Sequence, residues 1–399
     1  MFDFHARVPR EELDRRLAAL RARLTAADPA WKLALVNSKI NMYYLAGTMQ
    51  EGVLTITPDE TILWVRRSFD RAVGESNLPD IRPMRSYRTL GEYFTEAPAS
   101  VFVEAKTATL EWLGMVRKYL SFEAWKPLAP HLSALRARKS AYETDCMREA
   151  GRLHAEVLEE VMPARLREGM SEAELCGEVY LELLRRGSMG ICRYNQAAGE
   201  DVGGYCGFGE NANAGLAFDG PDGCAGTCIA MQAIGSPARQ LRKGELVLMD
   251  IPAGLLGYHT DKSVVYYYGS LADDPDAALI REAYGLCASI ETWAAAQLKT
   301  GAIPEEIYLQ AAAMVPDKFQ KGFMGGGKFL GHSIGLTMDE APVLAKSFRE
   351  PLEAGMLFAI EPKIMLDGIG IVGTENTYLV TDAGGESLTG SVLPLTEIG

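Results

Sequence analysis

The sequence has few histidines, no block of basic residues and no long apolar run. Five of its 399 residues are His, and 53 acidic residues outnumber 40 Lys and Arg, which gives a formal charge of −13. An acidic chain without clustered cations is poorly suited to nucleic acid or to an anionic membrane surface. No stretch approaches the ~20 apolar residues that cross a bilayer, and residues 1–13 carry charges in place of an apolar leader. We therefore expect a cytoplasmic protein with neither a nucleic-acid nor a membrane partner.

The cysteines lack the pattern of a disulfide scaffold or of a structural zinc site. Their number, seven, is odd, and the chain is long, so we do not expect a disulfide-stapled fold. Cys192, Cys206, Cys224 and Cys228 cluster in the sequence, but their intervals do not match paired C-x₂-C spacing. We expect small buried or free thiols.

Length and periodicity indicate two α/β parts. In the first part, a helical pattern over 11–24 precedes apolar strands and a hairpin at 53–57 and 61–65. The basic segment 135–139 separates this part from a second one, so we expect domains at residues 1–138 and 139–399. Helices in the second part are expected at 142–162, 172–186 and 276–298, and strands at 246–249, 263–268, 356–360 and 370–380. Residues 190–240 show little periodicity and are expected to be rich in loops.

Four carboxylates fall at the ends of predicted strands in the second part. Asp250 closes an apolar strand, and Asp261 follows eleven positions later, beyond two glycines. A hairpin of this kind brings both carboxylates to one face. Glu361 and Glu375 lie on either side of an Asp-Gly turn in a second predicted hairpin. The sequence thus predicts two pairs of carboxylates on two hairpins.

His332 lies between these hairpins in the sequence. Four carboxylates in one buried site repel one another unless cations neutralise them, and two divalent ions supply the matching charge. One imidazole among oxygen ligands suits Mn²⁺, Fe²⁺, Co²⁺ or catalytic Zn²⁺. Each residue taken alone has an ordinary structural interpretation, so the prediction depends on their order and spacing. The sequence therefore predicts a centre of two divalent ions, held by Asp250, Asp261, His332, Glu361 and Glu375.

This arrangement resembles the M24 "pita-bread" metallopeptidases, which include methionine aminopeptidases, Xaa-Pro aminopeptidases, prolidases and creatinases. The resemblance covers essentially the whole chain. It implies a smaller creatinase-type α/β domain at residues 1–138 and a pita-bread catalytic domain at 139–399. Further motifs that carry it are Asn41-Met-x-Tyr44-Leu-Ala-Gly47, Leu135-Arg-x-x-Lys139-Ser140-x-x-Glu143 and Gly331-His332-x-x-Gly335-Leu336.

The resemblance also implies an activity and a set of roles. The five residues would be the metal ligands, and Glu361 would in addition handle the proton of the attacking water. The expected reaction is metal-assisted hydrolysis of a short peptide of Xaa-Pro type, by an aminopeptidase or dipeptidase. The expected assembly is a homodimer.

Two features of these peptidases are missing. Their His-Glu-x-Pro motif reads Asp339-Glu340-x-Pro342 here, and no histidine lies between residues 155 and 258, where the family carries one that contacts substrate. A carboxylate in place of a neutral imidazole changes the charge presented to substrate. We expect Asp339 to lie near the metals as a catalytic or substrate-binding residue.

His259, two residues before Asp261, has two open interpretations. It faces the site and binds substrate in place of the missing histidine, or strand alternation turns it to solvent.

The same departures leave alternatives to the peptidase. One is another enzyme on the fold, either a lyase similar to the dimethylsulfoniopropionate-cleaving members or a creatinase-like C–N hydrolase. Creatinases do not keep the metal ligands, so the intact set here counts against that form. The other alternative is a non-catalytic binding module, whose known relatives also lose the ligands.

Overall fold

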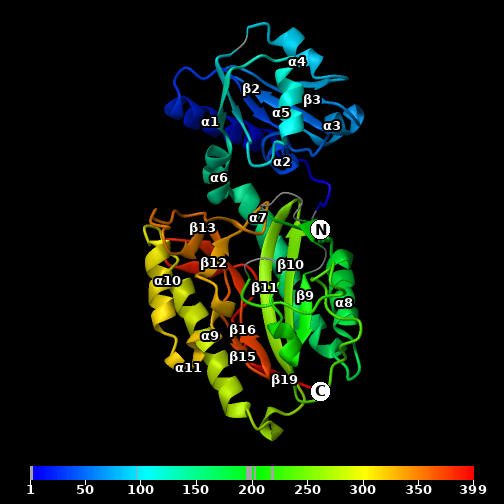
Figure 1. The fold of residues 1–399 in the computed structure, drawn as a ribbon, viewed down its shortest axis with the longest axis vertical. Coiled ribbons are helices and arrows are strands. Elements are labelled where there is room, and N and C mark those ends of the chain that lie inside the picture. Colours follow the sequence, from blue (N-terminus) through cyan, green and yellow to red (C-terminus); the bar gives the residue numbers. More distant parts are fainter. Residues whose placement is uncertain (1–2, 97, 195–199, 202–203, 217–219) are drawn as a thin grey trace. The chain divides into compact units, whose positions relative to one another are not determined.

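The computed structural model describes residues 3–96, 98–194, 200–201, 204–216 and 220–399. The chain divides into two compact units, Met1–Arg136 and Ala137–Gly399 (Figure 1). Each unit mixes helices with strands around its own buried apolar core. The expected α/β fold class is therefore confirmed for both.

A mixed sheet with strand order β4-β3-β2-β1-β5-β6 forms the centre of the first unit. The expected hairpin is present as β2 and β3, which pair antiparallel, whereas β1, β5 and β6 run parallel to one another. The strands are β1 (Ala34–Val36), β2 (Gly52–Ile56), β3 (Thr61–Val65), β4 (Ile81–Pro83), β5 (Ser100–Val103) and β6 (Ala124–Pro127). The helices are α1 (Arg10–Ala27), α2 (Lys39–Ala46), α3 (Phe69–Glu75), α4 (Arg88–Tyr93), α5 (Leu110–Arg117) and α6 (Ala129–Ala137).

Two helices at the start of the second unit begin with capping boxes. The Ser140 hydroxyl accepts a hydrogen bond from the Glu143 amide, and the Glu143 carboxylate accepts one from the Ser140 amide. Ser171 and Glu174 repeat this arrangement. The helices are α7 (Ala141–Ala155), α8 (Glu172–Arg185), α9 (Ala277–Gln297), α10 (Pro304–Ala313) and α11 (Asp317–Gln320). The helix expected at 142–162 changes to π-helical turns at Glu156–Val161.

The second unit contains two larger sheets, with strand orders β19-β11-β10-β9 and β13-β12-β14-β17-β18, and two hairpins, β15-β16 and β7-β8. The strands of the first half are β7 (Cys192–Arg193), β8 (Glu200–Asp201), β9 (Tyr205–Phe208), β10 (Glu245–Leu255) and β11 (Tyr258–Tyr268). Those of the second half are β12 (Phe329–Ser333), β13 (Glu340–Ala345), β14 (Leu357–Ile360), β15 (Lys363–Leu366), β16 (Gly370–Gly373), β17 (Asn376–Val380), β18 (Gly385–Ser387) and β19 (Thr396–Ile398).

Helices cover the outer faces of these sheets (Figure 1). Helices α7 and α8 pack on β9, β10 and β11, and helices α9 and α10 pack on the strands that follow β11 in the chain. Apolar side chains from β10, β11, β14 and β16 meet those of α9 in one core. Both faces of the central strands are therefore buried. No helix in the described part of the chain combines the length and the apolar character that a membrane crossing requires.

Strands β10 and β11 are longer than the sequence pattern predicts. The pattern indicates strands at 246–249 and 263–268, but polar residues in the middle of the hairpin belong to the sheet. Thr260, Asp261, Lys262 and Ser263 are all buried in β11. Because polar side chains are usually exposed, a run of them resembles a loop in the sequence. This buried polar run contains Asp261, one of the predicted metal ligands.

Candidate metal centre

The β10–β11 hairpin places Asp250 and Asp261 on one face of its sheet. Asp250 pairs with Ser263, and Pro252 pairs with Asp261, so the two aspartates are diagonal neighbours two positions apart. The connecting turn has positive φ at Leu256 (48°) and at Gly257 (89°), which matches the primed turns of two-residue hairpins. The expected pairing of carboxylates by a hairpin is present.

Glu361 and Glu375 occupy breaks between strands. Glu361 lies between β14 and β15, and Glu375 lies between β16 and β17. The residue pairs of β15 and β16 bring these two breaks to the same level, since Lys363 pairs with Gly373. Glu375 also forms a bridge with Ser263 of β11, and the Ser263 hydroxyl donates to Glu375 Oε2 at 2.6 Å. This contact joins the second hairpin to the first.

His332 is held on β12, opposite Ala359 of β14. Its Nδ1 lies 3.2 Å from the Ser333 carbonyl oxygen, so the neutral ring that donates from Nδ1 keeps an acceptor lone pair on Nε2. Ring orientation by a backbone carbonyl is the usual arrangement of a metal-ligating histidine. Nε2 is therefore the atom available to a cation.

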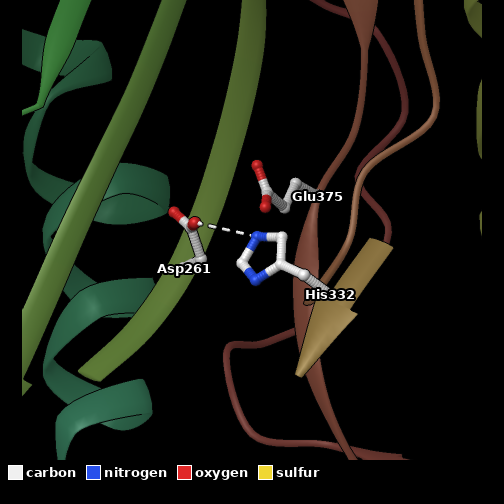
Figure 2. A group of neighbouring side chains, drawn as sticks. All are labelled: Asp261, His332 and Glu375. Atoms are coloured by element: carbon white, nitrogen blue, oxygen red, sulfur yellow. Dashed lines mark ion pairs between the residues drawn. The ribbon is translucent and has the colours of Figure 1, made fainter. Parts of the chain in front are cut away.

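Asp261 and Glu375 lie beside the His332 imidazole (Figure 2). Asp261 Oδ2 lies 3.8 Å from Nε2, and Glu361 Oε1 lies 3.6 Å from it. Asp261, His332 and Glu375 each offer a ligand atom within 4.8 Å of the others. Two ligands of one ion, each about 2.0–2.2 Å from it, are separated by about 3–4 Å. These distances fit a shared ion, whereas they are too long for hydrogen bonds.

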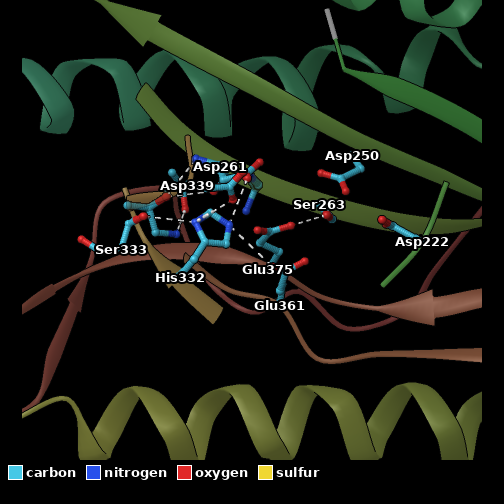
Figure 3. Close-up of polar contacts among 12 residues, drawn as sticks. Asp222, Asp250, Asp261, Ser263, His332, Ser333, Asp339, Glu361 and Glu375 are labelled. Carbon is cyan, nitrogen blue, oxygen red and sulfur yellow. Dashed lines mark hydrogen bonds and ion pairs between the residues drawn. The ribbon is translucent and has the colours of Figure 1, made fainter. Parts of the chain in front are cut away.

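Lys363, which the sequence analysis did not single out, reaches into the same group of acids. Its Nζ lies 3.2 Å from Asp250 Oδ2, 3.2 Å from Glu361 Oε2 and 3.0 Å from Glu375 Oε2. A further carboxylate, Asp222 Oδ2, lies 3.2 Å away. Asp222 and Asp250 lie on one side of Glu375, and His332 lies on the other (Figure 3). The side chain of Lys363 is fully buried.

The carboxylates and the lysine shift one another's pKa values. Burial and repulsion from Glu375 raise the pKa values of both Asp261 and Glu361 well above their ordinary range. Burial acts in the same direction on Asp250, but attraction to Lys363 and hydrogen bonds outweigh it and lower the Asp250 pKa. For Lys363, burial lowers the pKa, and the surrounding carboxylates outweigh burial and raise it well above its ordinary value. The surrounding carboxylates therefore favour the ammonium form of Lys363.

Asp222 is a second residue that the sequence analysis missed. It lies in the loop-rich region, is fully buried, and accepts a hydrogen bond from the Tyr205 hydroxyl at 2.8 Å. Burial and repulsion from Asp250 raise the pKa of Asp222 to about 8. In the sequence, Asp222 follows Gly-Pro and precedes Gly, which is typical of an ordinary turn acid. For Lys363, the sequence offers one indication: it is a charged residue in an otherwise apolar strand. A lysine buried in such a strand is rare unless it is paired with an opposite charge.

A small pocket of about 50 Å³ opens beside the centre. Asp250, Asp261, His332 and Glu361 form one part of its wall. The rest of the wall is mostly aromatic, apolar or backbone, from Tyr194, Tyr205, Phe329, Met338, Pro221 and Pro252 among others. Charged groups that converge beside an apolar wall are typical of small-molecule sites, but this pocket is smaller than the roughly 300–1,000 Å³ that such sites usually have.

Two family models match the chain. The model of metallopeptidase family M24 matches residues 145–382, and the model of the creatinase/prolidase N-terminal domain matches residues 16–138. The chain belongs to metallopeptidase family M24. The family resemblance inferred from the sequence is confirmed, and the creatinase-type domain precedes the M24 domain as anticipated.

Individual relatives within family M24 are distant. A protein of Bacillus subtilis named as a dipeptidase is 28% identical over 261 residues, which are 65% of this chain and 62% of that protein. The Xaa-Pro dipeptidase of Pyrococcus horikoshii is 22% identical over 367 residues, 89% of this chain and 92% of that enzyme. Among solved structures, the Xaa-Pro dipeptidase of Bacillus anthracis has a TM-score of 0.79 at 20% identity, covering 97% of this chain and 100% of that one. At this identity the structural likeness shows a shared fold.

Asp339, which stands where the M24 motif has histidine, lies at the centre but is partly open to solvent. Its Oδ1 is 3.7 Å from His332 Nδ1, its side chain is 47% exposed, and it lines the pocket. The expectation that it lies close to the other site residues agrees with this placement. Its role toward substrate stays a prediction.

The structure decides against one of the two interpretations of His259. It is fully buried, so the solvent-facing alternative is wrong. Nδ1 lies 3.0 Å from the Gly335 carbonyl oxygen, and Nε2 accepts a hydrogen bond from the Arg193 amide at 3.2 Å. Burial lowers the pKa of the His259 ring to about 4, which keeps the ring neutral. Both nitrogens are engaged by backbone groups, so a role in substrate binding forms no part of the function proposed below.

The donor set on the His332 side fits a divalent ion of the kind that family M24 uses. It combines one imidazole nitrogen with carboxylate oxygens, which suits Mn²⁺, Fe²⁺, Co²⁺ or Zn²⁺. Glu375 Oε1 is buried and has no hydrogen-bond partner among the described residues. A buried carboxylate oxygen without a partner is costly, and an ion would satisfy it. The residues present therefore fit at least one divalent ion.

Proposed function

We propose that this M24 protein is a divalent-metal-dependent peptidase that hydrolyses short peptides of Xaa-Pro type. The observation that carries the proposal is the convergence of Asp261, Glu361 and Glu375 on His332 Nε2 at the wall of a small pocket. Membership of a metallopeptidase family and the names of the relatives support the same activity. A divalent ion in such a site polarises the scissile carbonyl and lowers the pKa of water.

The protein side chains have separate tasks in this reaction. Asp261, His332 and Glu375 hold the ion, and the Ser333 carbonyl fixes the orientation of the imidazole. Glu361 is the group that takes the proton of the attacking water and returns it to the leaving amine.

Substrate positioning is assigned to the pocket wall and to Asp339. The aromatic and apolar residues Tyr205, Phe329 and Met338 can pack against an apolar side chain or a proline ring. Asp339 is half exposed at this wall and presents a carboxylate, which suits the α-ammonium group of a short peptide. A cationic amino terminus is what separates such a substrate from an internal peptide segment.

The ion is proposed to be Mn²⁺, Co²⁺, Fe²⁺ or Zn²⁺, and the sequence-based expectation is two ions per chain. The family resemblance also implies a homodimer, and the composition predicts a cytoplasmic location. Light scattering would test the dimer as a mass twice that of the 43.5 kDa chain.

The test combines metal content with peptide turnover. The protein is stripped with a chelator, reloaded separately with each of the four metals, and assayed on Xaa-Pro dipeptides and on matched Xaa-Ala dipeptides. We expect bound metal, turnover that depends on it, and preference for the Xaa-Pro series. Bound metal with no turnover of either series would contradict the peptidase and favour a different substrate on the same fold. Absence of bound metal would contradict the metalloenzyme itself.

A further inference from the structure

Lys363 is surrounded by acids on the side of the centre away from His332. Its ammonium group lies within 3.2 Å of oxygens from Asp222, Asp250, Glu361 and Glu375, and its side chain is completely buried. A buried lysine among several carboxylates acts as a positive ion whose position is fixed by the chain. Lys363 therefore places a fixed positive charge among carboxylates that could otherwise bind a metal ion.

The sequence-predicted ligands divide into two groups around two points. Asp250, Glu361 and Glu375 contact the Lys363 ammonium. Asp261, Glu361 and Glu375 surround His332 Nε2. Glu361 serves both points with different atoms, since Oε1 faces His332 and Oε2 faces Lys363. This is the arrangement of carboxylates that bridge two neighbouring cations.

The lysine stem is held in place by the β15–β16 hairpin. Lys363 pairs with Gly373, where an added Cβ would lie only 2.6 Å from Lys363 Cγ. The stem therefore passes directly over the glycine backbone. The whole side chain is buried, so the ammonium is shielded from solvent.

We propose that the Lys363 ammonium occupies one of the two cation positions of the centre, so that each chain holds a single divalent ion, on the His332 side. The inference rests on the proposed metal site but not on the peptidase activity. It replaces the expectation of two ions.

Electrostatics supports exclusion of a second ion. A divalent ion bound by Asp250 and Glu375 would share their oxygens with an ammonium only 3.0–3.2 Å from them, at a cost in like-charge repulsion. Displacing the ammonium instead would separate it from its carboxylates inside the protein, and an unpaired buried charge is strongly unfavourable. An ion on the His332 side would be held by Asp261 and His332, which are not among the carboxylate partners of Lys363, and would share only Glu361 and Glu375 with the ammonium.

The test is the stoichiometry of metal binding to the full-length protein. Chelator-treated protein is titrated with Co²⁺ or Mn²⁺ well above the dissociation constant, and bound metal per chain is measured by mass spectrometry after gel filtration. Electron paramagnetic resonance of the Mn²⁺ form separates an isolated ion from an exchange-coupled pair. We expect one ion per chain and the spectrum of an isolated Mn²⁺.

A truncated variant tests the lysine directly. Lys363→Ala removes the ammonium and opens its position, so we expect the stoichiometry to double to two ions per chain. Lys139→Ala is the matched control, because Lys139 is also buried and pairs with a carboxylate, Glu340 at 3.5 Å, outside the predicted ligand set. The control is expected to keep one ion. Circular dichroism checks that each variant is folded.

Each result decides something. Two ions in the unaltered protein would overturn the role of Lys363 and leave the metal site standing. One ion in both the unaltered protein and folded Lys363→Ala would also overturn it, because the lysine would not be the excluding group. No ion in the unaltered protein would overturn the proposed metalloenzyme as well. If Lys363→Ala does not fold, the unaltered stoichiometry alone still decides between one ion and two.

Discussion

Asp339 differs from its acidic neighbours in the centre because half of its side chain is exposed. If it binds the α-ammonium of the substrate, Asp339→Asn removes the charge and keeps the shape. A partly exposed ion pair contributes about 0.2–1 kcal/mol, so we expect KM to rise about 1.4- to fivefold, with kcat little changed. Steady-state kinetics on a dipeptide substrate would measure both constants.

The control for this experiment is Asp367→Asn. Asp367 lies in the turn between β15 and β16, pairs with Lys321, and has a side chain that is 86% exposed. Its substitution is expected to leave KM unchanged. A kcat loss in Asp339→Asn at constant KM would instead place Asp339 in the chemical step.

His154 on α7 makes a second residue-scale prediction, about pH. Burial lowers the pKa of its ring to about 3, against 6.5 for an unperturbed histidine. The folded protein therefore keeps the ring neutral, while the unfolded chain binds a proton as the pH falls below 6.5. This stabilisation is complete above pH 6.5 and is lost progressively toward pH 3. Between pH 7 and pH 5 the loss is about 2 kcal/mol.

Comparing the protein with His154→Gln isolates this effect from other titrating groups. Urea unfolding at pH 7 and pH 5 gives the free energy of unfolding of both proteins, and their difference should change by about 2 kcal/mol in favour of the variant at pH 5. His5, which is exposed, provides the control variant His5→Gln. A pH-independent difference for His154→Gln would show that the ring is not held neutral.

At the scale of elements, two glycines of the second unit should respond oppositely to alanine. A Cβ at Gly373 would lie 2.6 Å from the Pro362 carbonyl oxygen and from Lys363 Cγ. We expect Gly373→Ala to destabilise the unit by about 1–3 kcal/mol through overpacking. Gly285 is exposed on α9, and a Cβ added there would meet no atom within 4 Å beyond the backbone of its own helix. Gly285→Ala should therefore stabilise the unit by about 0.5–1 kcal/mol through helix propensity. Chemical denaturation measures both, and equal effects would contradict the packing of Lys363 over Gly373.

The hairpins that carry the acids could be predicted because their signal is local. Asp250 and Asp261 follow from an apolar strand, a glycine-containing turn and the alternation of strand residues. Glu361 and Glu375 follow from the second turn in the same way. Their assignment to one centre came from resemblance and from spacing, since no local pattern places two hairpins together.

The contacts that could not be predicted from the sequence join segments that are far apart in the chain. Asp222 approaches Lys363 from a loop that lies more than a hundred residues earlier in the chain, and a turn acid gives no sign of such a contact. Lys363 follows Glu361 by two positions, but its burial depends on the pairing of β15 with Gly373. The polar middle of β11 resembles a loop in the sequence. Its residues are nevertheless buried, because the second sheet and α7 cover them, and the sequence does not show these contacts.

At the scale of the whole molecule, the two units have separate cores, and the candidate metal residues all belong to Ala137–Gly399. We expect calorimetry to resolve two unfolding transitions, of which metal shifts only one. At a metal concentration 100 times the dissociation constant, binding stabilises by about 2.7 kcal/mol, or about 5–10 °C for a unit of this size. A metal-induced shift of both transitions would contradict separate folding units, as would a single transition.

The fixed ammonium of Lys363 also bears on the order of events in biosynthesis. A cluster of buried acids that depended entirely on captured ions could form only where those ions were already present. A counter-charge that is part of the polypeptide arrives with it from the ribosome, so strands β10, β11, β15 and β16 can assemble before any metal is supplied. Metal loading then becomes a late step on a finished scaffold, which an exchange of metals in the folded protein would reveal.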